Sequence, residues 1–369
     1  MSLEQAPSHP YTNNELCAYL RSRSVVVLYP EIETDDENIK YYYDFSQSLE
    51  EYTRAFAHLE VPWAWQGVSL QNLDTVLSGI AELPNPLVIN LCDGDEVNGA
   101  PGISVLRALE QYNILYTGAH ENFFHLTTSK IVMKKEFDAH SVPNAAWCQL
   151  DENSIQNIPQ HLTYPLIVKP AVSGGSMGVG VNSVVDTHAQ LTEQYNLVLQ
   201  GYRGWNLTVD GVLAEEYIAG REFTCFIVGN YTQPDLVQQY HPVERVFHHS
   251  LSEKEKFLSF DRLWETYENE QAMPNNEFFY TYQEPEHTLW QQIQQTSWDA
   301  YCAVQGTGFG RVDLRYNGNK LYVLEVNAQC GISEDEDFTS IGAILRYSKV
   351  SFAQMILDIV RAALQLNAE

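Results

Sequence analysis

The sequence predicts an α/β protein of more than one domain, with a parallel layer near the N-terminus and an antiparallel sheet near the C-terminus. Three observations support this class. Short apolar runs alternate with segments of helical periodicity at the start of the chain. A glycine-rich stretch flanked by β-branched residues occupies the middle, and two β-rich runs joined by a turn cluster lie near the end. A chain of 369 residues usually divides into two or three domains.

Composition restricts the classes of partner. The chain carries 21 Lys and Arg against 48 Asp and Glu, a net charge of −27. Such an acidic surface repels nucleic acid and anionic membranes, so neither is expected as a main partner. The sequence shows no signal-peptide core and no run near the roughly 18 apolar residues of a membrane span. The six cysteines are scattered without a CxxC pair, which predicts reduced thiols in a cytoplasmic protein.

The first part of the chain predicts alternating strands and helices. Residues 24–29 (SVVVLY), 86–91 (PLVINL) and 113–118 (NILYTG) are short apolar runs typical of buried strands. Residues 41–59 and 103–112 carry apolar side chains at helical spacing. This rhythm favours parallel pairing of the strands. Ligands usually bind at the carboxyl ends of such strands.

Residues 127–140 (TTSKIVMKKEFDAH) predict a helix, with Thr or Ser as N-cap and Val142-Pro143 beyond its end. Lys130 lies in the first turn of this helix, where a positive charge opposes the helix dipole. A solvated lysine and a functional lysine are about equally compatible with that position.

Residues 164–185 (YPLIVKPAVSGGSMGVGVNSVV) form a glycine-rich flap between two strands. A P-loop is excluded because the GxxxxGK[ST] order is absent and no helical pattern follows. Lys169 lies in an otherwise apolar strand that enters the flap, which favours phosphate binding over a floppy hairpin tip. Glycines allow close backbone approach to an anion. The residues whose N–H groups could bind it are Gly174, Gly175, Ser176 and Met177.

Residues 189–202 predict a helix, and 213–229 (LAEEYIAGREFTCFIVG) predict two strands around a tight turn. A nucleotide base could bond the main chain at the end of the first strand, while Glu222 could accept hydrogen bonds from ribose. A solvated acidic edge would give the same pattern. The main-chain candidates are Glu215, Glu216, Tyr217 and Ile218.

The segment 231–290 is the least informative. Its His248-His249 pair has no third ligand at metal spacing, so a satisfied or exposed pair is expected. Residues 291–305 predict a helix, and residues 351–366 predict an amphipathic closing helix.

The stretch 309–327 carries the residues best suited to bind a metal ion. Asn317-Gly318 is a hairpin signal that usually marks a two-residue turn. In that register Asp313 opposes Tyr322, which puts Asp313 and Glu325 on opposite faces of the sheet. A shared metal site is then impossible.

A three-residue loop, 317–319, instead places Tyr316 opposite Lys320 and Asp313 opposite Val323. The residues that then share one face are Arg311, Asp313, Glu325 and Asn327. Neighbouring carboxylates on one face need cations, and oxygen ligands favour Mg²⁺ or Mn²⁺. We therefore predict the odd-numbered loop and a metal site on this face.

These motifs resemble the ATP-grasp superfamily and, within it, the D-alanine–D-alanine ligases. The resemblance runs from about Leu87 to the C-terminus and rests on IVKPAVSGGSMGVG, LAEEYIAGREFT, GFGRVDL and YVLEVNAQCG. It implies an ATP-grasp fold. The implied parts are an N-terminal parallel α/β domain (1–128), a central subdomain with the flap (129–219) and a C-terminal antiparallel subdomain with the metal site (220–369).

The resemblance also implies roles for site residues. Lys130 and Lys169 would hold the ATP phosphates, and the flap around Ser176 would close over them. Residues 215–218 would bind adenine and Glu222 ribose. Asp313, Glu325 and Asn327 would hold two Mg²⁺ ions, and the tetrahedral intermediate would be stabilised by Arg311 and the backbone N–H of Gly331.

The substrate half departs from the family pattern. The Ser-Ala-Glu-type loop that holds the first substrate's amine is replaced by PEIETDDEN. The serine and small apolar residue that bind the acceptor carboxylate are replaced by an acidic run, Glu334 to Asp337. The lysine expected near residues 257–264 is missing, and Arg262 is the nearest cation.

The main interpretation is a ligase that joins an amino-acid-like amine to a carbon activated by ATP, as a carboxylate or an enol, in specialised metabolism. Mycosporine-like amino acid ligases are the example. One alternative is a D-alanine–D-alanine ligase of cell-wall synthesis. Another is an ATP-binding regulatory protein without turnover, against which the intact metal face argues. The substrates would be small molecules, and a homodimer is compatible with relatives of this kind.

Overall fold

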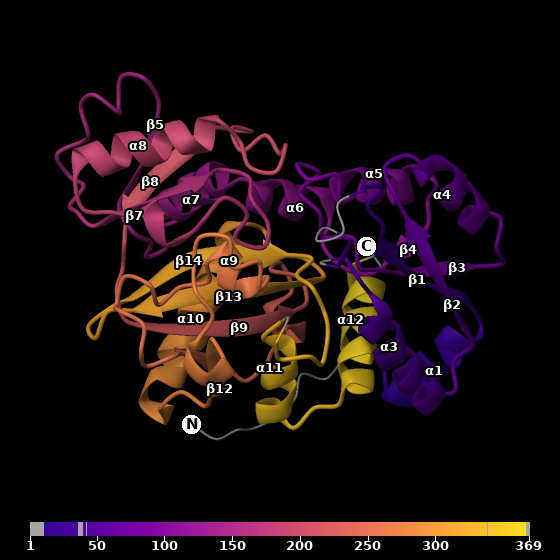
Figure 1. The fold of residues 1–369 in the computed structure, drawn as a ribbon. Coiled ribbons are helices and arrows are strands. Elements are labelled where there is room, and N and C mark those ends of the chain that lie inside the picture. The colour runs from indigo at the N-terminus through magenta and orange to yellow at the C-terminus, as the bar shows by residue number, and fades with distance from the viewer. Residues whose placement is uncertain (1–10, 36–39, 42, 338, 367–369) are drawn as a thin grey trace.

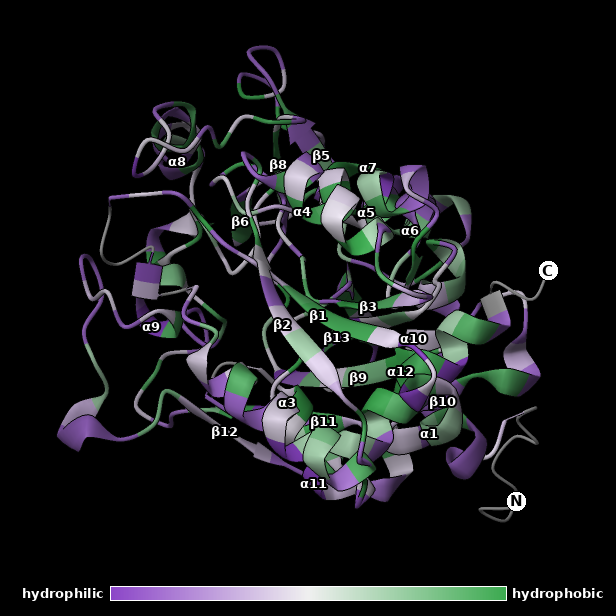
Figure 2. Ribbon diagram, turned by 90° about the vertical axis from the view of Figure 1, so that its right-hand side faces the viewer, coloured by the Kyte–Doolittle hydropathy of each residue, from purple (hydrophilic) through white to green (hydrophobic). Residues whose placement is uncertain are grey.

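The computed structural model describes residues 11–35, 40, 41, 43–337 and 339–366, and its helices surround three β-sheets (Figure 1). The α/β class predicted from the sequence is confirmed. Figure 2 shows hydrophobic residues concentrated along central strands such as β1 and β13. None of the helices within these ranges is both long enough and apolar enough to span a bilayer.

The N-terminal layer is a parallel sheet, as predicted, and its strand order is β2-β1-β3-β4. Residues 25–28 of β1 are all buried, because helices cover both faces of a central parallel strand. The elements of this layer are α1 (Asn13–Arg21), β1 (Ser24–Pro30), α3 (Ser46–Leu59), β2 (Trp63–Val68), α4 (Leu73–Ala81), β3 (Pro86–Asn90), α5 (Ile103–Gln111) and β4 (Leu115–Tyr116).

Three elements of this layer, α1, β2 and α4, were not predicted. The strand β2 lies at the sheet edge, where residues 63–66 alternate between half-buried and exposed. An edge strand therefore lacks the continuous apolar run by which β1 and β3 were found. The predicted helix 41–59 begins later, at Ser46. Part of the acidic segment after β1, residues 36–39, lies outside the described residues.

The C-terminal helix α12 (Phe352–Leu366) returns to the N-terminal layer and packs against α1 and α3 (Figure 1). The Phe352 and Tyr52 rings meet edge to face at 5.2 Å between centroids. Leu16 of α1, Phe56 of α3 and Ile356 of α12 belong to one buried hydrophobic cluster. The core of the N-terminal layer is thus completed by the end of the chain.

The largest sheet is antiparallel, in the order β12-β11-β9-β13-β14, with β10 paired to β9. The helix α10 packs against β9, β13 and β14, and it begins before the predicted start at residue 291. The elements are β9 (Arg221–Val228), β10 (Gln238–Gln239), β11 (Val243–Phe247), α9 (Phe260–Leu263), β12 (Tyr280–Gln283), α10 (His287–Ala303), β13 (Phe309–Tyr316), β14 (Leu321–Ala328) and α11 (Ile341–Ser348).

The third sheet is antiparallel in the order β5-β8-β6-β7. The two strands predicted in 213–229 are present, but β8 and β9 belong to different sheets, so the turn between them links sheets. The division of the chain at residues 128 and 219 remains a prediction. The elements are α6 (Glu121–Thr128), α7 (Lys130–Ala139), β5 (Trp147–Leu150), β6 (Leu166–Pro170), β7 (Val184–Val185), α8 (His188–Leu199) and β8 (Val212–Glu216).

The hairpin between β13 and β14 differs from the predicted one. Tyr316 pairs with Leu321, so the loop has an even number of residues, and the three-residue loop was wrong. The register then shifts by one residue at a β-bulge after Asp313, which pairs with Glu325 while Leu314 pairs with Val323. Because the extra residue reverses the alternation of side chains, both carboxylates still lie on one face.

Candidate active site

A cavity of about 440 Å³ lies where the three sheets meet. The N-terminal layer contributes the loop after β3, the third sheet contributes Lys169 and the flap, and the largest sheet contributes the face of Asp313. Every residue predicted for the site lines this one cavity. Those residues are Lys130, Lys169, Gly174, Gly175, Ser176, Met177, Glu215, Glu216, Tyr217, Ile218, Glu222, Arg311, Asp313, Glu325, Asn327 and Gly331.

The predicted metal face brings two carboxylates and an amide together. Asn327 Nδ2 lies 3.0 Å from Asp313 Oδ2 and 3.4 Å from Glu325 Oε1. Arg311 Nη2 lies 2.8 Å from Asp313 Oδ2. Burial alone would raise the pKa of Asp313, but the Arg311 guanidinium outweighs burial and lowers that pKa. Asp313 is therefore held as a carboxylate, the form that binds a cation.

Lys130 reaches this face from a break in the predicted helix 127–140. The helix is divided at Ser129 into α6 and α7, and the Lys130 backbone N–H donates to the Ala171 carbonyl at 2.7 Å. Lys130 Nζ donates to the Ser173 carbonyl at 2.9 Å and lies 3.9 Å from Glu325 Oε2. Burial lowers the pKa of Lys130. The lysine is thus part of the cavity rather than solvated.

A buried triad that the sequence analysis missed supports Lys169. Glu215 Oε1 accepts from Lys169 Nζ at 2.7 Å, and Glu215 Oε2 lies 2.5 Å from Lys134 Nζ. The side chains of Glu215 and Lys134 are only 3% and 2% exposed, so neither charge is screened by water. Glu215 was predicted only through its main chain. Lys134 is four residues after Lys130 on one helix face, and that spacing could have identified it.

The triad makes stability depend on pH. Burial opposes ionisation of Glu215, but Lys134 and Lys169 lower its pKa to about 2, against 4.5 in an unfolded chain. A depressed folded-state pKa contributes stability above pH 4.5 that is lost as pH falls toward 2. We expect urea unfolding between pH 5 and 2.5 to show a steeper loss in the wild type than in Glu215→Gln. Equal slopes would contradict an ionised triad.

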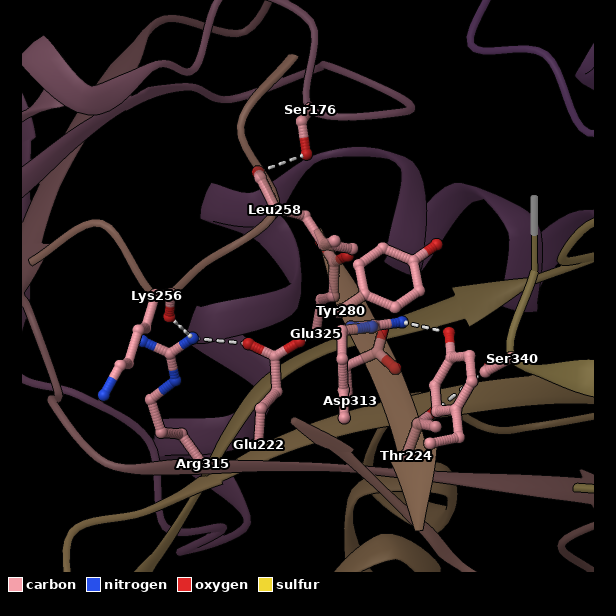
Figure 3. A network of polar contacts seen from close by, with 12 residues as sticks. Ser176, Glu222, Thr224, Lys256, Leu258, Tyr280, Asp313, Arg315, Glu325 and Ser340 are labelled. Carbon is pink, nitrogen blue, oxygen red and sulfur yellow. Dashed lines mark hydrogen bonds and ion pairs between the residues drawn. The ribbon is translucent and has the colours of Figure 1, made fainter. Parts of the chain in front are cut away.

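The flap binds the carboxylate of Asp95. The backbone N–H of Gly174 donates to Asp95 Oδ2 at 2.7 Å, which demonstrates the anion-binding capacity predicted for this loop. Two further bonds fasten the flap to residues 248–279, here called the cover loop. Ser176 Oγ donates to the Leu258 carbonyl at 2.7 Å (Figure 3), and Trp264 Nε1 donates to the Gly175 carbonyl at 2.7 Å.

Glu222 lies between two arginines that the sequence analysis did not single out. One carboxylate oxygen accepts from Arg315 (Figure 3), and the other accepts from Arg245. Each oxygen keeps a second lone pair, so the predicted ribose contact is still available. Arg315 also donates to the Ile218 carbonyl at 3.1 Å. Arg245 and Arg315, on strands of the largest sheet, therefore give the cavity additional positive charge.

Arg262, the nearest cation to the missing lysine, does not line the cavity. It pairs with Glu255 at 3.0 Å and Glu270 at 3.2 Å inside the cover loop. Arg262 thus stabilises the loop, and the unpredicted Arg245 and Arg315 are the additional cations that face the cavity.

The acidic run is turned away from the cavity. Glu334 pairs with Arg54 at 3.1 Å and Glu336 pairs with Arg346 at 2.7 Å. Beyond the run, Ser340 lines the cavity and Ile341 follows it. A serine followed by an apolar residue therefore lies just past the acidic run, with the serine on the cavity wall.

The comparisons with known proteins agree with this geometry. The family model described as "D-ala D-ala ligase C-terminus" matches residues 136–361. This chain belongs to the D-Ala-D-Ala ligase family. A D-alanine–D-alanine ligase of Ralstonia pickettii is 26% identical over 82% of this chain and 84% of that protein. One of Bordetella avium is 25% identical over 69% of this chain and 72% of that protein.

Solved structures of the D-Ala-D-Ala ligase family share the fold. The Bacillus anthracis D-alanine–D-alanine ligase complexed with ATP has a TM-score of 0.64 at 16% identity, covering 94% of this chain and 99% of that one. The VanG D-Ala:D-Ser ligase of Enterococcus faecalis has a TM-score of 0.65 at 16% identity, covering 93% and 99%. The predicted resemblance is confirmed. This member of the D-Ala-D-Ala ligase family is an ADP-forming carbon–nitrogen ligase of ATP-grasp fold that uses ATP and Mg²⁺.

One further cavity residue in this D-Ala-D-Ala ligase family member was missed. Asp93 follows β3, at the carboxyl end of a parallel strand, where ligands were expected. Its side chain is open to the cavity. It also lies next to Gly331, since a Cβ atom added to that glycine would be 3.8 Å from Asp93 Oδ2. Enclosure by the cavity walls and the neighbouring Asp95 raise the pKa of Asp93 to about 7, against the opposing effect of Arg311.

Proposed function

We propose that the protein is a dipeptide ligase, which activates the carboxylate of one amino acid with ATP and joins it to the amine of a second. The second amino acid keeps its own carboxylate. The observation that carries this proposal is the orientation of the acidic run, which leaves Ser340 and Arg311 on the cavity wall. Acidic side chains in the cavity would have repelled a second carboxylate, whereas a hydroxyl and a guanidinium attract it.

The named relatives favour the D-alanine–D-alanine reaction over the specialised-metabolism reading. That interpretation rested on three departures from the family pattern, and one of them no longer supports it, because both Glu334 and Glu336 are paired with arginines outside the cavity. D-Alanine is therefore the first substrate to test in both positions.

We assign the ATP half of the cavity as follows. Lys130 and Lys169 neutralise phosphate oxygens, and the flap N–H groups from Gly174 to Met177 enclose them once Asp95 is displaced. The main chain of residues 215–218 binds the base and Glu222 the ribose. A rigid set of donors stabilises the charge that moves during phosphoryl transfer, without reorganisation at that moment.

The metal face fits the ions that the family uses. Two carboxylates and one amide meet on one sheet face, with the amide nitrogen toward the carboxylates. Carboxylate and amide oxygens are ligands that Mg²⁺ prefers, and the amide presents its oxygen if its side chain turns over. Asp313, Glu325 and Asn327 would hold the ions, which would neutralise charge on the transferred phosphoryl group. Lys130 lies beside Glu325, so phosphate oxygens would be bound from both sides.

Arg311 and the backbone N–H of Gly331 are assigned to the second chemical step. The amine attacks the acyl phosphate, a tetrahedral centre with an anionic oxygen forms, and phosphate leaves as the C–N bond is completed. Both residues line the cavity beside the metal face. The flap and cover loop exclude water, which would otherwise hydrolyse the acyl phosphate.

Asp93 is assigned to a substrate amine. Asp93 lies beside Gly331 on the cavity wall. From there its carboxylate can bind the substrate amine and accept a proton from it. Its raised pKa suits proton acceptance near neutral pH. Asp93→Asn is expected to lower kcat/KM for the amino acid about 10²-fold with the KM for ATP little changed. Asp335→Asn, in the outward acidic run, is the control, and equal losses in the two variants would contradict the assignment.

The decisive experiment follows phosphate release and product mass with Mg-ATP and a panel of D- and L-amino acids. Amino-acid-dependent phosphate release with a dipeptide product supports the proposal. If a product forms only when a cyclohexenone-type substrate is supplied, the result would instead support a ligase of specialised metabolism. Phosphate release independent of every amino acid, or none, would favour a nucleotide-binding protein.

A further inference from the structure

The cover loop, residues 248–279, is closed at its base. It leaves the sheet after β11 and returns at β12, where Phe247 pairs with Tyr280. The backbone N–H of His248 donates to the Phe279 carbonyl at 2.9 Å. Between these ends the loop bonds the flap through Leu258 and Trp264 and lines the cavity. Anything that fixes the two ends therefore restrains the wall of the active site.

Three potential metal ligands meet at this base. His248 and His249 come from the beginning of the loop and Glu277 from its end, and their ligand atoms all lie within 4.8 Å of one another. The two imidazole rings are 4.3 Å apart between centroids, and His248 Nε2 lies 2.6 Å from Glu277 Oε2. The expectation that the histidine pair lacks a third ligand was wrong, because the fold supplies Glu277 from a distant segment.

We propose that His248, His249 and Glu277 form a binding site for a divalent transition metal ion, with Zn²⁺ as the reference ion. Two imidazoles and one carboxylate are typical Zn²⁺ ligands, at bond lengths of about 2.0–2.2 Å, and water completes a tetrahedron. Mg²⁺ is disfavoured because it prefers oxygen ligands. The site is separate from the metal face of Asp313 and does not depend on the proposed dipeptide activity.

A neighbouring residue prepares His248 for this role. The Ser250 backbone N–H donates to His248 Nδ1 at 3.3 Å, and His248 Nε2 donates to Glu277 Oε2, so Nε2 carries the ring proton. An ion bound at Nε2 requires that proton to move to Nδ1, where Ser250 Oγ, at 2.7 Å, can accept it. Which ring nitrogen carries the proton follows from these contacts.

Access and charge favour a cation at this site. His249 is exposed, and the Glu277 side chain is 50% exposed, so an ion can enter without opening the core. The net charge of −27 attracts cations to the surface. An ion bound to both ends of the loop would reduce the freedom of the intervening chain, and the flap fastened to it would be restrained as well.

The test measures Zn²⁺ binding to the full chain after chelator treatment, by equilibrium dialysis with Zn²⁺ alone. We expect one ion per chain at the cover loop, with affinity reduced at least tenfold in both His249→Ala and Glu277→Gln. These exposed positions are chosen because the fold survives their substitution. Zn²⁺ is also expected to slow proteolysis within residues 248–279 in the wild type and not in these variants.

Two controls separate this site from others. His140→Ala removes another surface histidine beside a glutamate, 3.8 Å from Glu136, and should leave Zn²⁺ binding unchanged. Asp313→Asn removes a ligand of the metal face and should retain the ion at the cover loop. Zn²⁺ affinity unaffected in His249→Ala and Glu277→Gln would overturn the site. Binding without any change in proteolysis would overturn its restraint of the loop.

Discussion

Asp313→Asn is expected to reduce ligation by about three orders of magnitude while the protein stays folded. The carboxylate lies between Arg311 and Asn327 on the metal face, and an amide cannot replace its negative charge. Loss of metal-assisted charge stabilisation costs several kcal/mol in the transition state, and each 1.36 kcal/mol is about tenfold in rate. Phosphate release at saturating D-alanine and Mg-ATP measures the loss.

The matched control for Asp313→Asn is Asp299→Asn. Asp299 is an exposed aspartate on α10, which packs on the same sheet, and its carboxylate bonds only a surface glutamine among the contacts described. Its substitution should leave the rate within twofold. Turnover of Asp313→Asn near the wild-type rate, with an unchanged melting temperature, would refute the metal assignment.

Lys134→Met is expected to destabilise the protein by about 3 kcal/mol. Removing one partner from a buried ion pair leaves an uncompensated charge, at a cost of about 3–5 kcal/mol. Glu215 keeps Lys169 as its second partner, so the lower end of that range applies. The Met side chain has similar length, so the loss reports charge rather than a cavity. Urea unfolding at pH 7 measures the change in free energy of unfolding.

The control for the triad is the adjacent Lys135, which is exposed on the same helix. Lys135→Met should change the free energy of unfolding by no more than about 0.5 kcal/mol. Weaker ATP binding in Lys134→Met is expected as well, because Glu215 would draw Lys169 more strongly from the phosphates. Lys134→Met with wild-type stability would show that the triad charges are screened.

The metal face shows how a correct prediction can rest on a wrong intermediate step. The metal-site hypothesis required Asp313 and Glu325 to share a face, and an odd-numbered loop was the simplest hairpin that would place them there. The chain satisfies it with an even loop and a bulge instead. The bulge leaves one residue of β14, Leu324, without a partner on β13, and nothing in the local sequence marks it.

The remaining errors have a common cause in contacts between distant segments. Buried strands such as β1 were found because their apolar runs are local signals, whereas the edge strand β2 has none. Glu277 becomes a neighbour of His248 only after β11 pairs with β12. The outward orientation of Glu334 depends on its pairing with Arg54, in a distant segment. The residues of the site were thus predictable from their motifs, whereas their contacts with distant segments were not.

The return of α12 to the N-terminal layer has a consequence for biosynthesis. A ribosome releases α1 and α3 early, but the side chains that complete their shared cluster, such as Phe352 and Ile356, emerge last. Part of the apolar surface of the N-terminal layer therefore stays exposed to solvent until translation is nearly finished. A premature stop before residue 352 would damage the first-made part of the protein as much as the part it deletes, and a nascent chain of this kind would depend on chaperones throughout its synthesis.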